Sequence, residues 1–330
     1  MMPINHHLDP LERSGIRVFT NLAKATPDCR MLTIGEPDQA TPEPIRQAAL
    51  EALSRGETHY APNQGTASLR SAIAAFETNR GRPTAPEEVL VTVGATQALY
   101  TALTGILNPG DQVIIPTPAF SLYATIVTAA GAEPVFLDVS KTDFQITEEA
   151  LNACLTEKTK AIVLNSPCNP TGVILRESSL DTVARAVLGR EIYLICDNVY
   201  DKLVYAPCGD LTRREDLRPQ TILCQSFSKP YAMTGWRVGY LICPQTLMER
   251  LLLLSAAEIA AVPTFLQAAA EAALEVDTEP VRLLYRRRRD YVCSRLDRMG
   301  LSYPQPEGAF YVFPDISQFG IPSWQFCERM

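Results

Sequence analysis

Residues 161–172 read Ala-Ile-Val-Leu-Asn-Ser-Pro-Cys-Asn-Pro-Thr-Gly. The four apolar residues at positions 161–164 suit a short strand that is buried on both faces of a sheet. The Ser-Pro and Asn-Pro steps that follow favour a rigid, non-helical turn. The amide of Asn169 can then point out of that turn as both hydrogen-bond donor and acceptor. A plain turn would also explain the Pro and Gly residues, but it explains the two successive steps, Ser-Pro and Asn-Pro, less well.

Short apolar runs of the same kind occur on both sides of this stretch, and helical patterns separate most of them. They predict strands at residues 89–93, 113–115, 134–137, 161–164, 192–196 and 222–224. The helical patterns cover residues 42–55, 66–78, 95–107, 120–130 and 179–188 and much of the segment after residue 244. Residues 308–313 predict one further strand with alternating aromatic residues. This alternation predicts an α/β fold with a mostly parallel sheet between layers of helices.

The alternation runs from about residue 42 to residue 243, and a mostly helical stretch follows it; we expect residues 42–284 to form the larger domain. The two ends of the chain, residues 1–41 and 285–330, lack it. They predict a second, smaller α+β domain that is built from both termini. The length of 330 residues suits one large domain plus a smaller one.

The composition argues against several classes of protein. The 30 Lys and Arg residues against 37 Asp and Glu residues give a net charge of −7, which disfavours nucleic-acid binding. The apolar runs stay well below the ~18–20 residues of a membrane span, and the first residues lack the layout of a signal peptide. The 9 Cys residues form no C-x-x-C pair and, with 3 His, offer no metal-ligand spacing. We therefore expect a cytoplasmic protein with reduced thiols, no metal site and no membrane partner.

A candidate nucleophile lies at residues 226–229, Ser-Phe-Ser-Lys, which follow a predicted strand and precede Arg237 by eight residues. Burying a lysine costs free energy unless pairing or a lowered pKa offsets the cost. One chemistry that uses such a lysine is a Schiff base with a carbonyl cofactor. The Ser226 hydroxyl and the Arg237 guanidinium could then hold a phosphate dianion near Lys229. A surface lysine in a Ser-rich loop explains this short motif equally well.

Other predicted strand ends carry similar candidates. Asp197 directly follows the strand at residues 192–196, at the edge where open α/β sheets bind ligands, and Tyr200 lies three residues further on. The helix that starts at Gly94 has free backbone N–H groups that can bind phosphate, and Phe120 could stack on a flat ring. Considered one at a time, Asp197 is explained more simply as a turn residue and Phe120 as a core aromatic. Their common position at carboxyl ends of predicted strands is what those explanations do not predict.

In these motifs the sequence resembles the pyridoxal-phosphate enzymes of fold type I, in particular the class I/II aminotransferases related to aspartate aminotransferase. The matching stretches run in family order over nearly the whole chain, at residues 34–38, 59–65, 94–99, 165–172, 197–200 and 226–240. The resemblance implies a three-layer α/β/α fold with a seven-stranded, mostly parallel sheet. It also implies a biosynthetic enzyme of amino-acid metabolism that moves an amino group between an L-amino acid and a 2-oxo acid.

The resemblance implies a role for each matching residue. Lys229 would form the internal aldimine with pyridoxal phosphate and then shuttle the proton between the substrate carbon and the cofactor. Asp197 would keep the pyridine nitrogen protonated, so that the ring acts as an electron sink. Tyr200 and Asn169 would hydrogen-bond the phenolic oxygen and tune the aldimine pKa. The catalytic residues implied are therefore Lys229, Asp197 and Tyr200.

The remaining matches would hold the cofactor, the substrate or the partner subunit. Phe120 would stack on the ring, and the phosphate would be bound by Ser226, Arg237 and the backbone of Ala95 and Thr96. In this family the residue that matches Tyr60 reaches the phosphate of the neighbouring subunit, which implies a homodimer with shared active sites. Gly35 would lie beside the substrate carboxylate on a segment that moves as the site closes, and Asn169 would also contact the substrate.

The C-terminal end departs from the family pattern. The family usually has an Arg downstream of the strand that matches residues 308–313, where it pairs with the substrate carboxylate. Here only Arg329 follows that strand. We therefore expect the C-terminal part of the small domain to be missing. The chain would then be a fragment of a full aminotransferase, a natural truncation with weak or no activity, or a protein whose missing function is supplied from elsewhere.

Two other functions stay open. The nearest alternative enzyme is a pyridoxal-phosphate-dependent carbon–sulfur β-lyase, and the other class is a catalytically idle cofactor-binding protein such as a regulatory domain of a transcription factor. No helix-turn-helix pattern precedes residue 34, which argues against the regulatory domain. The turn at Gly94 lacks G-x-G-x-x-G spacing, which disfavours a hydride-transferring dehydrogenase. The motifs do not identify the amino acid or the oxo acid.

Overall fold

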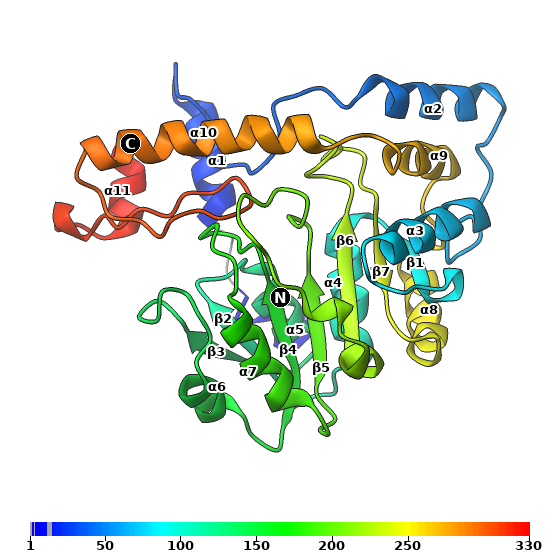
Figure 1. Cartoon of the computed structure of the whole chain (residues 1–330), viewed down its shortest axis with the longest axis horizontal. Helices are drawn as coiled ribbons and strands as arrows, with labels where there is room; N and C mark the ends of the chain where they lie inside the picture. The colour runs from blue at the N-terminus through cyan, green and yellow to red at the C-terminus, as the bar shows by residue number, and fades with distance from the viewer. Residues whose placement is uncertain (1, 3, 12–14) are drawn as a thin grey trace.

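The structure is a computed structural model that describes residues 2, 4–11 and 15–330. The strands of its described part are β1 (Val89–Thr92), β2 (Gln112–Thr117), β3 (Glu133–Asp138), β4 (Thr159–Asn165), β5 (Tyr193–Asp197), β6 (Thr221–Ser226) and β7 (Gly239–Ile242). They form one seven-stranded sheet with the order β1-β7-β6-β5-β4-β2-β3 (Figure 1). Strand β7 runs antiparallel to β1 and β6, and the other neighbours are parallel. The predicted mostly parallel α/β sheet is therefore confirmed.

Helices cover both faces of this sheet. They are α1 (Gly15–Ala25), α2 (Glu43–Ser54), α3 (Ala67–Asn79), α4 (Gly94–Ile106), α5 (Leu122–Ala129), α6 (Glu148–Cys154), α7 (Glu177–Val187), α8 (Gln245–Ile259), α9 (Thr264–Ala273), α10 (Glu279–Arg298) and α11 (Ser323–Arg329). Helices α4, α5 and α8 share one apolar cluster with the sheet, and α6 and α7 share another. In β4, Ala161 and Val163 belong to the first cluster, whereas Ile162 and Leu164 belong to the second. This alternation along one strand places the clusters on opposite faces of the sheet.

The register of the strands brings several carboxyl ends to one edge of the sheet. Asn165 at the end of β4 pairs with Asp197 at the end of β5, and Asp197 pairs in turn with Cys224 of β6. Ser226, the last residue of β6, pairs with Gly239 at the start of β7. Polar residues from motifs that are far apart in the sequence thus become neighbours at the edge where parallel sheets bind ligands.

All six strands predicted between residues 89 and 224 are present, with bounds shifted by a residue or two. The strand predicted at residues 308–313 is wrong, because Gly308 makes only an isolated antiparallel bridge with Val204. Ala309 has a φ of 56°, which interrupts the extended backbone that a strand needs. Its N–H donates to the Leu203 carbonyl, so the segment runs along a loop instead of along a sheet edge. Strand β7 is absent from the predicted strands, and its first two residues lie inside the matching stretch at residues 226–240.

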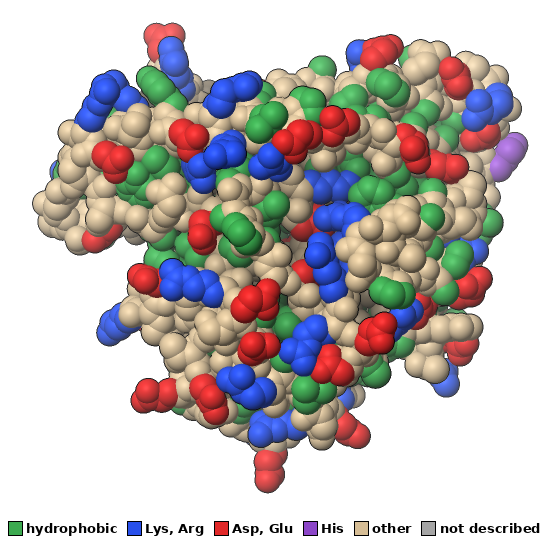
Figure 2. Space-filling view, in the orientation of Figure 1, with side chains coloured by type: hydrophobic (Ala, Val, Ile, Leu, Met, Phe, Trp, Pro, Cys, Tyr) green, Lys and Arg blue, Asp and Glu red, His purple; other side chains and the backbone are tan. Residues whose placement is uncertain are grey.

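The segments near the two ends of the chain lie together above the sheet, where Figure 1 shows α1 beside α10 and α11. The ring of Phe19 in α1 packs against Trp324 in α11, with centroids 4.7 Å apart. Asp38 accepts two hydrogen bonds from Arg288 of α10, at 2.8 and 2.9 Å. Positive and negative side chains are interspersed over the face viewed in Figure 2. No helix among the described residues has the length and apolar character needed to cross a membrane.

Candidate active site

The carboxylate of Asp197 is buried at the end of β5. The Tyr123 hydroxyl donates a hydrogen bond of 2.6 Å to its Oδ2, and the Val199 N–H donates to its Oδ1 at 3.4 Å. Burial raises the pKa of Asp197 to about 6, and the hydrogen bond from Tyr123 opposes that rise. A buried carboxylate of this kind favours a cationic or protonated partner at the same position.

The Lys229 amine lies in the loop after β6, where it donates a hydrogen bond of 2.5 Å to the Gly35 carbonyl. Its Nζ also lies 5.6 Å from the centre of the Phe310 ring. Burial lowers the pKa of Lys229, and the positive charge of Arg237 lowers it further. The structure therefore joins the motif at residues 34–38 to the lysine motif, and it increases the neutral fraction of this amine.

Tyr200 and Asn169 lie on neighbouring loops that are joined by hydrogen bonds. Asn165 donates from Nδ2 to the Asp197 carbonyl at 2.8 Å, and its Oδ1 accepts from the Asn169 N–H at 2.7 Å. The Tyr200 and Tyr311 hydroxyls are 2.6 Å apart. Burial raises the pKa of Tyr200 well above its usual value, and a hydrogen bond with Asn169 opposes that rise. Tyr200 therefore remains a neutral hydrogen-bond donor at physiological pH.

A cradle for an anion lies between the start of α4 and Arg237. A Cβ added to Gly94 would lie 2.5 Å from Arg237 Nη2, so a side chain here would displace the guanidinium, and the Gly94 φ of 69° also favours glycine. Arg237 has a φ of 56° and donates from Nη1 to the Thr234 carbonyl at 2.9 Å. Such left-handed backbone at a non-glycine residue is uncommon and often marks a functional site. The buried Ser226 hydroxyl accepts a hydrogen bond of 3.0 Å from the Ser228 N–H.

Two further expected cofactor residues are aromatic, and the structure places them differently. The partly buried Phe120 meets Tyr123 edge-on, with ring centroids 5.8 Å apart. Tyr60 stands apart from the other candidates, because 94% of its side chain is exposed in this single chain. The structure thus brings together predicted residues at the ends of β5 and β6 and in the loops after β4, β5 and β6, and it leaves Tyr60 on the surface.

The structure adds contacts that the sequence reasoning missed. Tyr123 holds the Asp197 carboxylate, and its place three residues after Phe120 in the same motif is a signal that could have identified it. Tyr311 contacts Tyr200 and fills the space beside Gly35, where an added Cβ would lie 2.5 Å from its hydroxyl. The aromatic pattern at residues 308–313 marked this segment, but it predicted a strand and no contact with the site.

This donor set fits pyridoxal phosphate. The start of α4, Arg237 and Ser226 offer positive charge and hydrogen-bond donors to a phosphate. The buried Asp197 carboxylate suits a protonated ring nitrogen, and the Lys229 amine suits a carbonyl group. The three groups come from one edge of the sheet, so a single flat molecule with an anionic end can meet all of them.

The chain resembles proteins of known activity along its length. Residues 27–319 match the family described as Aminotransferase class I and II. The aspartate aminotransferase of Pyrococcus abyssi is 38% identical over 100% of this chain and 87% of its own length. The probable N-acetyl-LL-diaminopimelate aminotransferase of Bacillus subtilis is 37% identical over 98% of this chain and 84% of its own length.

A solved structure of an aminotransferase also resembles this chain. The aspartate aminotransferase from Thermus thermophilus with maleate has a TM-score of 0.91 and 34% identity to this chain, and the match covers 96% of this chain and 86% of that one. The family model and these relatives together cover the whole of the candidate site. The chain therefore belongs to the class I and II aminotransferases, a family of pyridoxal-phosphate-dependent enzymes.

Proposed function

We propose that Lys229 is the residue that binds the cofactor covalently and moves the substrate proton as the enzyme transfers an amino group from an L-amino acid to a 2-oxo acid. The observation that carries this proposal is the Lys229 amine, which is partly buried beside the Gly35 carbonyl with its pKa lowered. A neutral amine is both a nucleophile and a base, so the lowered pKa increases the fraction that is ready for either task at neutral pH.

Pyridoxal phosphate, when bound, supplies a carbonyl group and a ring that serves as an electron sink. In our proposal Asp197 holds the protonated ring nitrogen, and its burial strengthens that ion pair. Tyr200 and Asn169 would donate hydrogen bonds to the phenolic oxygen, and Phe120 would stack on the ring. The hydrogen bonds that join Asn165 to Asp197 and Asn169 support this arrangement, since they hold the two loops in register.

The proposed phosphate site consists of the Ser226 hydroxyl, the Arg237 guanidinium and the backbone N–H groups of Ala95 and Thr96. Its support is the close approach of Arg237 to Gly94 at the start of α4, where the helix leaves N–H groups free. On the substrate side, we propose that Gly35 and Asn169 contact the amino acid. The hydrogen bond between Lys229 and the Gly35 carbonyl supports this position for residues 34–38.

We further propose a homodimer in which Tyr60 completes the phosphate site of the partner subunit. The high exposure of Tyr60 in the single chain supports this role, because a large aromatic side chain on a surface suits an interface. Tyr60 would then contribute to a phosphate site only when two chains associate, as in isologous two-fold dimers.

Mixing Lys229→Ala subunits with Tyr60→Ala subunits tests the shared site. A random mixture contains hybrids with one intact site, which should restore about a quarter of wild-type turnover on simple pairing statistics. The measurement is turnover after the two inactive or weak variants are unfolded together and refolded. Each variant treated alone is the control. Activity equal to the average of the two controls would show that Tyr60 and Lys229 act within one subunit.

The proposal also covers the domain organisation, the cellular location and the metabolic role of the protein. We propose that residues 42–284 form the large domain and that residues 1–41 and 285–330 form the small one. The contacts of Phe19 with Trp324 and of Asp38 with Arg288 support a joint unit of both ends. We also propose a cytoplasmic location and a biosynthetic role, and the free thiols of all nine cysteines are consistent with a reducing compartment.

A panel of L-amino acids with 2-oxoglutarate tests the proposed reaction and its substrates. Aspartate and a diaminopimelate derivative should be included, because the relatives reported above are named for aspartate and for N-acetyl-LL-diaminopimelate. The expected result is an oxo acid from the donor together with glutamate. Pyruvate and ammonia from a cysteine conjugate would instead indicate a carbon–sulfur β-lyase. A bound cofactor without either reaction would indicate an idle binding protein.

A further inference from the structure

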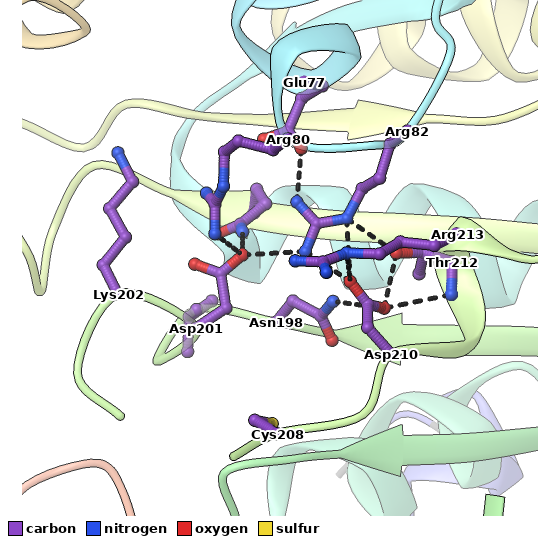
Figure 3. Close-up of polar contacts among 12 residues, drawn as sticks. Glu77, Arg80, Arg82, Asn198, Asp201, Lys202, Cys208, Asp210, Thr212 and Arg213 are labelled. Atoms are coloured by element: carbon purple, nitrogen blue, oxygen red, sulfur yellow. Dashed lines mark hydrogen bonds and ion pairs between the residues drawn. The ribbon is translucent and has the colours of Figure 1, made fainter. Parts of the chain in front are cut away.

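A buried ionic cluster lies directly behind the loops that carry the candidate site, and the proposed function gives it no role. We call it the Arg82 network. It is shown in Figure 3 and consists of Glu77, Arg80, Arg82, Asp201, Asp210 and Arg213. Three carboxylates therefore face three guanidinium groups. The side chains of Arg82 and Glu77 are 4% and 0% exposed, which makes them the buried centre of the network.

Arg82 uses its whole guanidinium group within this cluster (Figure 3). Its Nη1 donates to Glu77 at the end of α3, and its Nη2 donates to Asp201 at 3.1 Å and to Asp210 at 2.6 Å. Its Nε donates to Asp210 at 2.9 Å and to Thr212 at 2.8 Å. Because the guanidinium is a rigid planar fork, these contacts fix three separate segments of chain relative to one another.

Two of those segments belong to the loop that follows β5. Asp201 comes directly after Tyr200, and Asp210 accepts a hydrogen bond of 3.4 Å from Asn198, which comes directly after Asp197. Arg82 therefore holds the loop at residues 197–210 through two carboxylates, Asp201 directly and Asp210, which also binds Asn198. The short distance in sequence leaves little freedom for Asp197 or Tyr200 to move while Asp201 and Asn198 stay fixed.

The network also reaches the strand that leads to the lysine. Asp201 accepts a hydrogen bond of 2.8 Å from Gln225, the residue before Ser226 in β6. Tyr240 of β7 donates to the other oxygen of Glu77. The same network thus contacts two segments of the candidate site. One is the loop after β5 with Asp197 and Tyr200, and the other is the end of β6 that leads from Ser226 to Lys229.

The energetics favour a role in positioning. Desolvating two or more ions costs several kcal/mol each, and the pairing of buried ions often only offsets that cost. A cluster of apolar residues could fill the same volume, but it would not fix the orientation of the loop after β5 relative to β6 as strictly. Removing one member, however, leaves a buried carboxylate without its partner. Loss of Arg82 would therefore displace the loop toward solvent or repack it.

We propose that Arg82 is a positioning residue for the transfer reaction, which acts by holding Asp197 and Tyr200 at a fixed distance from Ser226 and Lys229. The proposal rests on the functions proposed above for those four residues. Arg82 contacts neither cofactor nor substrate in this arrangement. Its effect should therefore appear in how the cofactor is bound and how it titrates.

The test compares holoenzymes that carry Arg82→Met, Arg82→Lys and Arg213→Gln. Arg213→Gln is the matched control, because Arg213 also pairs with Asp210, at 3.4 Å, but half of its side chain is exposed. We measure the dissociation constant of pyridoxal phosphate and the pH midpoint of the visible absorbance of the bound cofactor. Both report on the site without depending on the fraction of protein that is active.

Arg82→Met should weaken cofactor binding by about tenfold or more, in line with the loss of a buried charge pair. The absorbance midpoint should rise, because weaker donation from Tyr200 and Asn169 to the phenolic oxygen favours the protonated form. Arg82→Lys keeps the charge but loses the fork, so it should fall between Arg82→Met and wild type. Arg213→Gln should stay within about twofold of wild type, as expected for an exposed ion pair.

Unchanged affinity and midpoint in folded Arg82→Met would overturn the proposal. If Arg82→Met does not fold, Asp210→Asn supplies the second test, because it keeps the side-chain shape while it weakens the link from Arg82 to Asn198. It should move both quantities in the same direction, and wild-type values for it would overturn the proposal as well. Absence of lysine-linked absorbance in the wild type would instead contradict the proposed function itself.

Discussion

Replacing Lys229 with Ala should abolish turnover and remove the visible absorbance of the enzyme-bound cofactor. The variant loses the partly buried amine that lies 2.5 Å from the Gly35 carbonyl, and with it both the covalent link and the base proposed here. General acid–base and covalent steps each contribute large factors, so we expect a loss of at least about 10⁴-fold in kcat. Absorption spectra of the reconstituted protein and turnover with the preferred amino acid measure the two effects.

Lys202→Met is the matched control for this substitution. Lys202 is another lysine whose pKa is lowered, to about 7, chiefly by burial, and its amine lies over the rings of Phe76 and Tyr231. If a lowered pKa alone were sufficient for cofactor attachment, both variants would lose the absorbance. We expect only Lys229→Ala to lose it. Normal turnover in Lys229→Ala would overturn the assignment of the catalytic lysine.

The sequence predicted the residues of the site that lie at the ends of regular strands. Asp197 and Ser226 each end a strand whose short apolar run was visible in the sequence, and parallel strands end at the same edge of a sheet. The position of each could therefore be inferred from local pattern alone. Lys229 and Arg237 follow directly from Ser226 because they belong to the same short motif.

The residues that the sequence did not predict depend on contacts between distant segments. Arg82 lies in a loop after α3 and pairs with Asp201 and Asp210, more than a hundred positions away. Neither partner has a local signature, since exposed and buried ion pairs look alike in a single sequence. Residues 308–313 carry an alternating aromatic pattern that is typical of a strand, but Gly308 makes only an isolated bridge with Val204 and Ala309 turns the backbone. Periodicity reports on local fit and carries no information about the partner.

Burial shifts the two central groups of the site in opposite directions. It raises the pKa of Asp197 to about 6 and lowers the pKa of Lys229, so in both cases the neutral form is favoured. The cofactor-free protein therefore bears the cost of an ionised Asp197 at neutral pH, which the hydrogen bonds from Tyr123 and Val199 offset only in part. A protonated ring nitrogen would supply the missing positive charge. Cofactor binding and the ionisation of Asp197 should consequently be coupled.

Asp197→Asn should lower kcat by roughly 10²–10³-fold or more, because the substrate carbanion loses the electrostatic support of the carboxylate. The same substitution should stabilise the cofactor-free protein at neutral pH. The folded-state pKa of Asp197, about 6, lies above its usual value of 3.8. The stability that this group contributes is therefore fully present below about pH 4 and is lost as the pH rises through 6. At pH 7.5 the loss of unfolding free energy relative to low pH is on the order of 3 kcal/mol.

Thermal unfolding of the cofactor-free proteins at pH 4.5 and 7.5 measures this effect. The gain from Asp197→Asn should be larger at pH 7.5, and pyridoxal phosphate should then raise the Tm of the wild type more than that of the variant. Tyr123→Phe provides the opposite control, because it keeps the carboxylate but removes the hydroxyl that donates to it at 2.6 Å. It should destabilise the cofactor-free protein most at pH 7.5, where Asp197 is ionised. An equal gain from Asp197→Asn at both pH values would mean that the carboxylate is not held in a strained, charged state, and that its pairing with the cofactor has another basis.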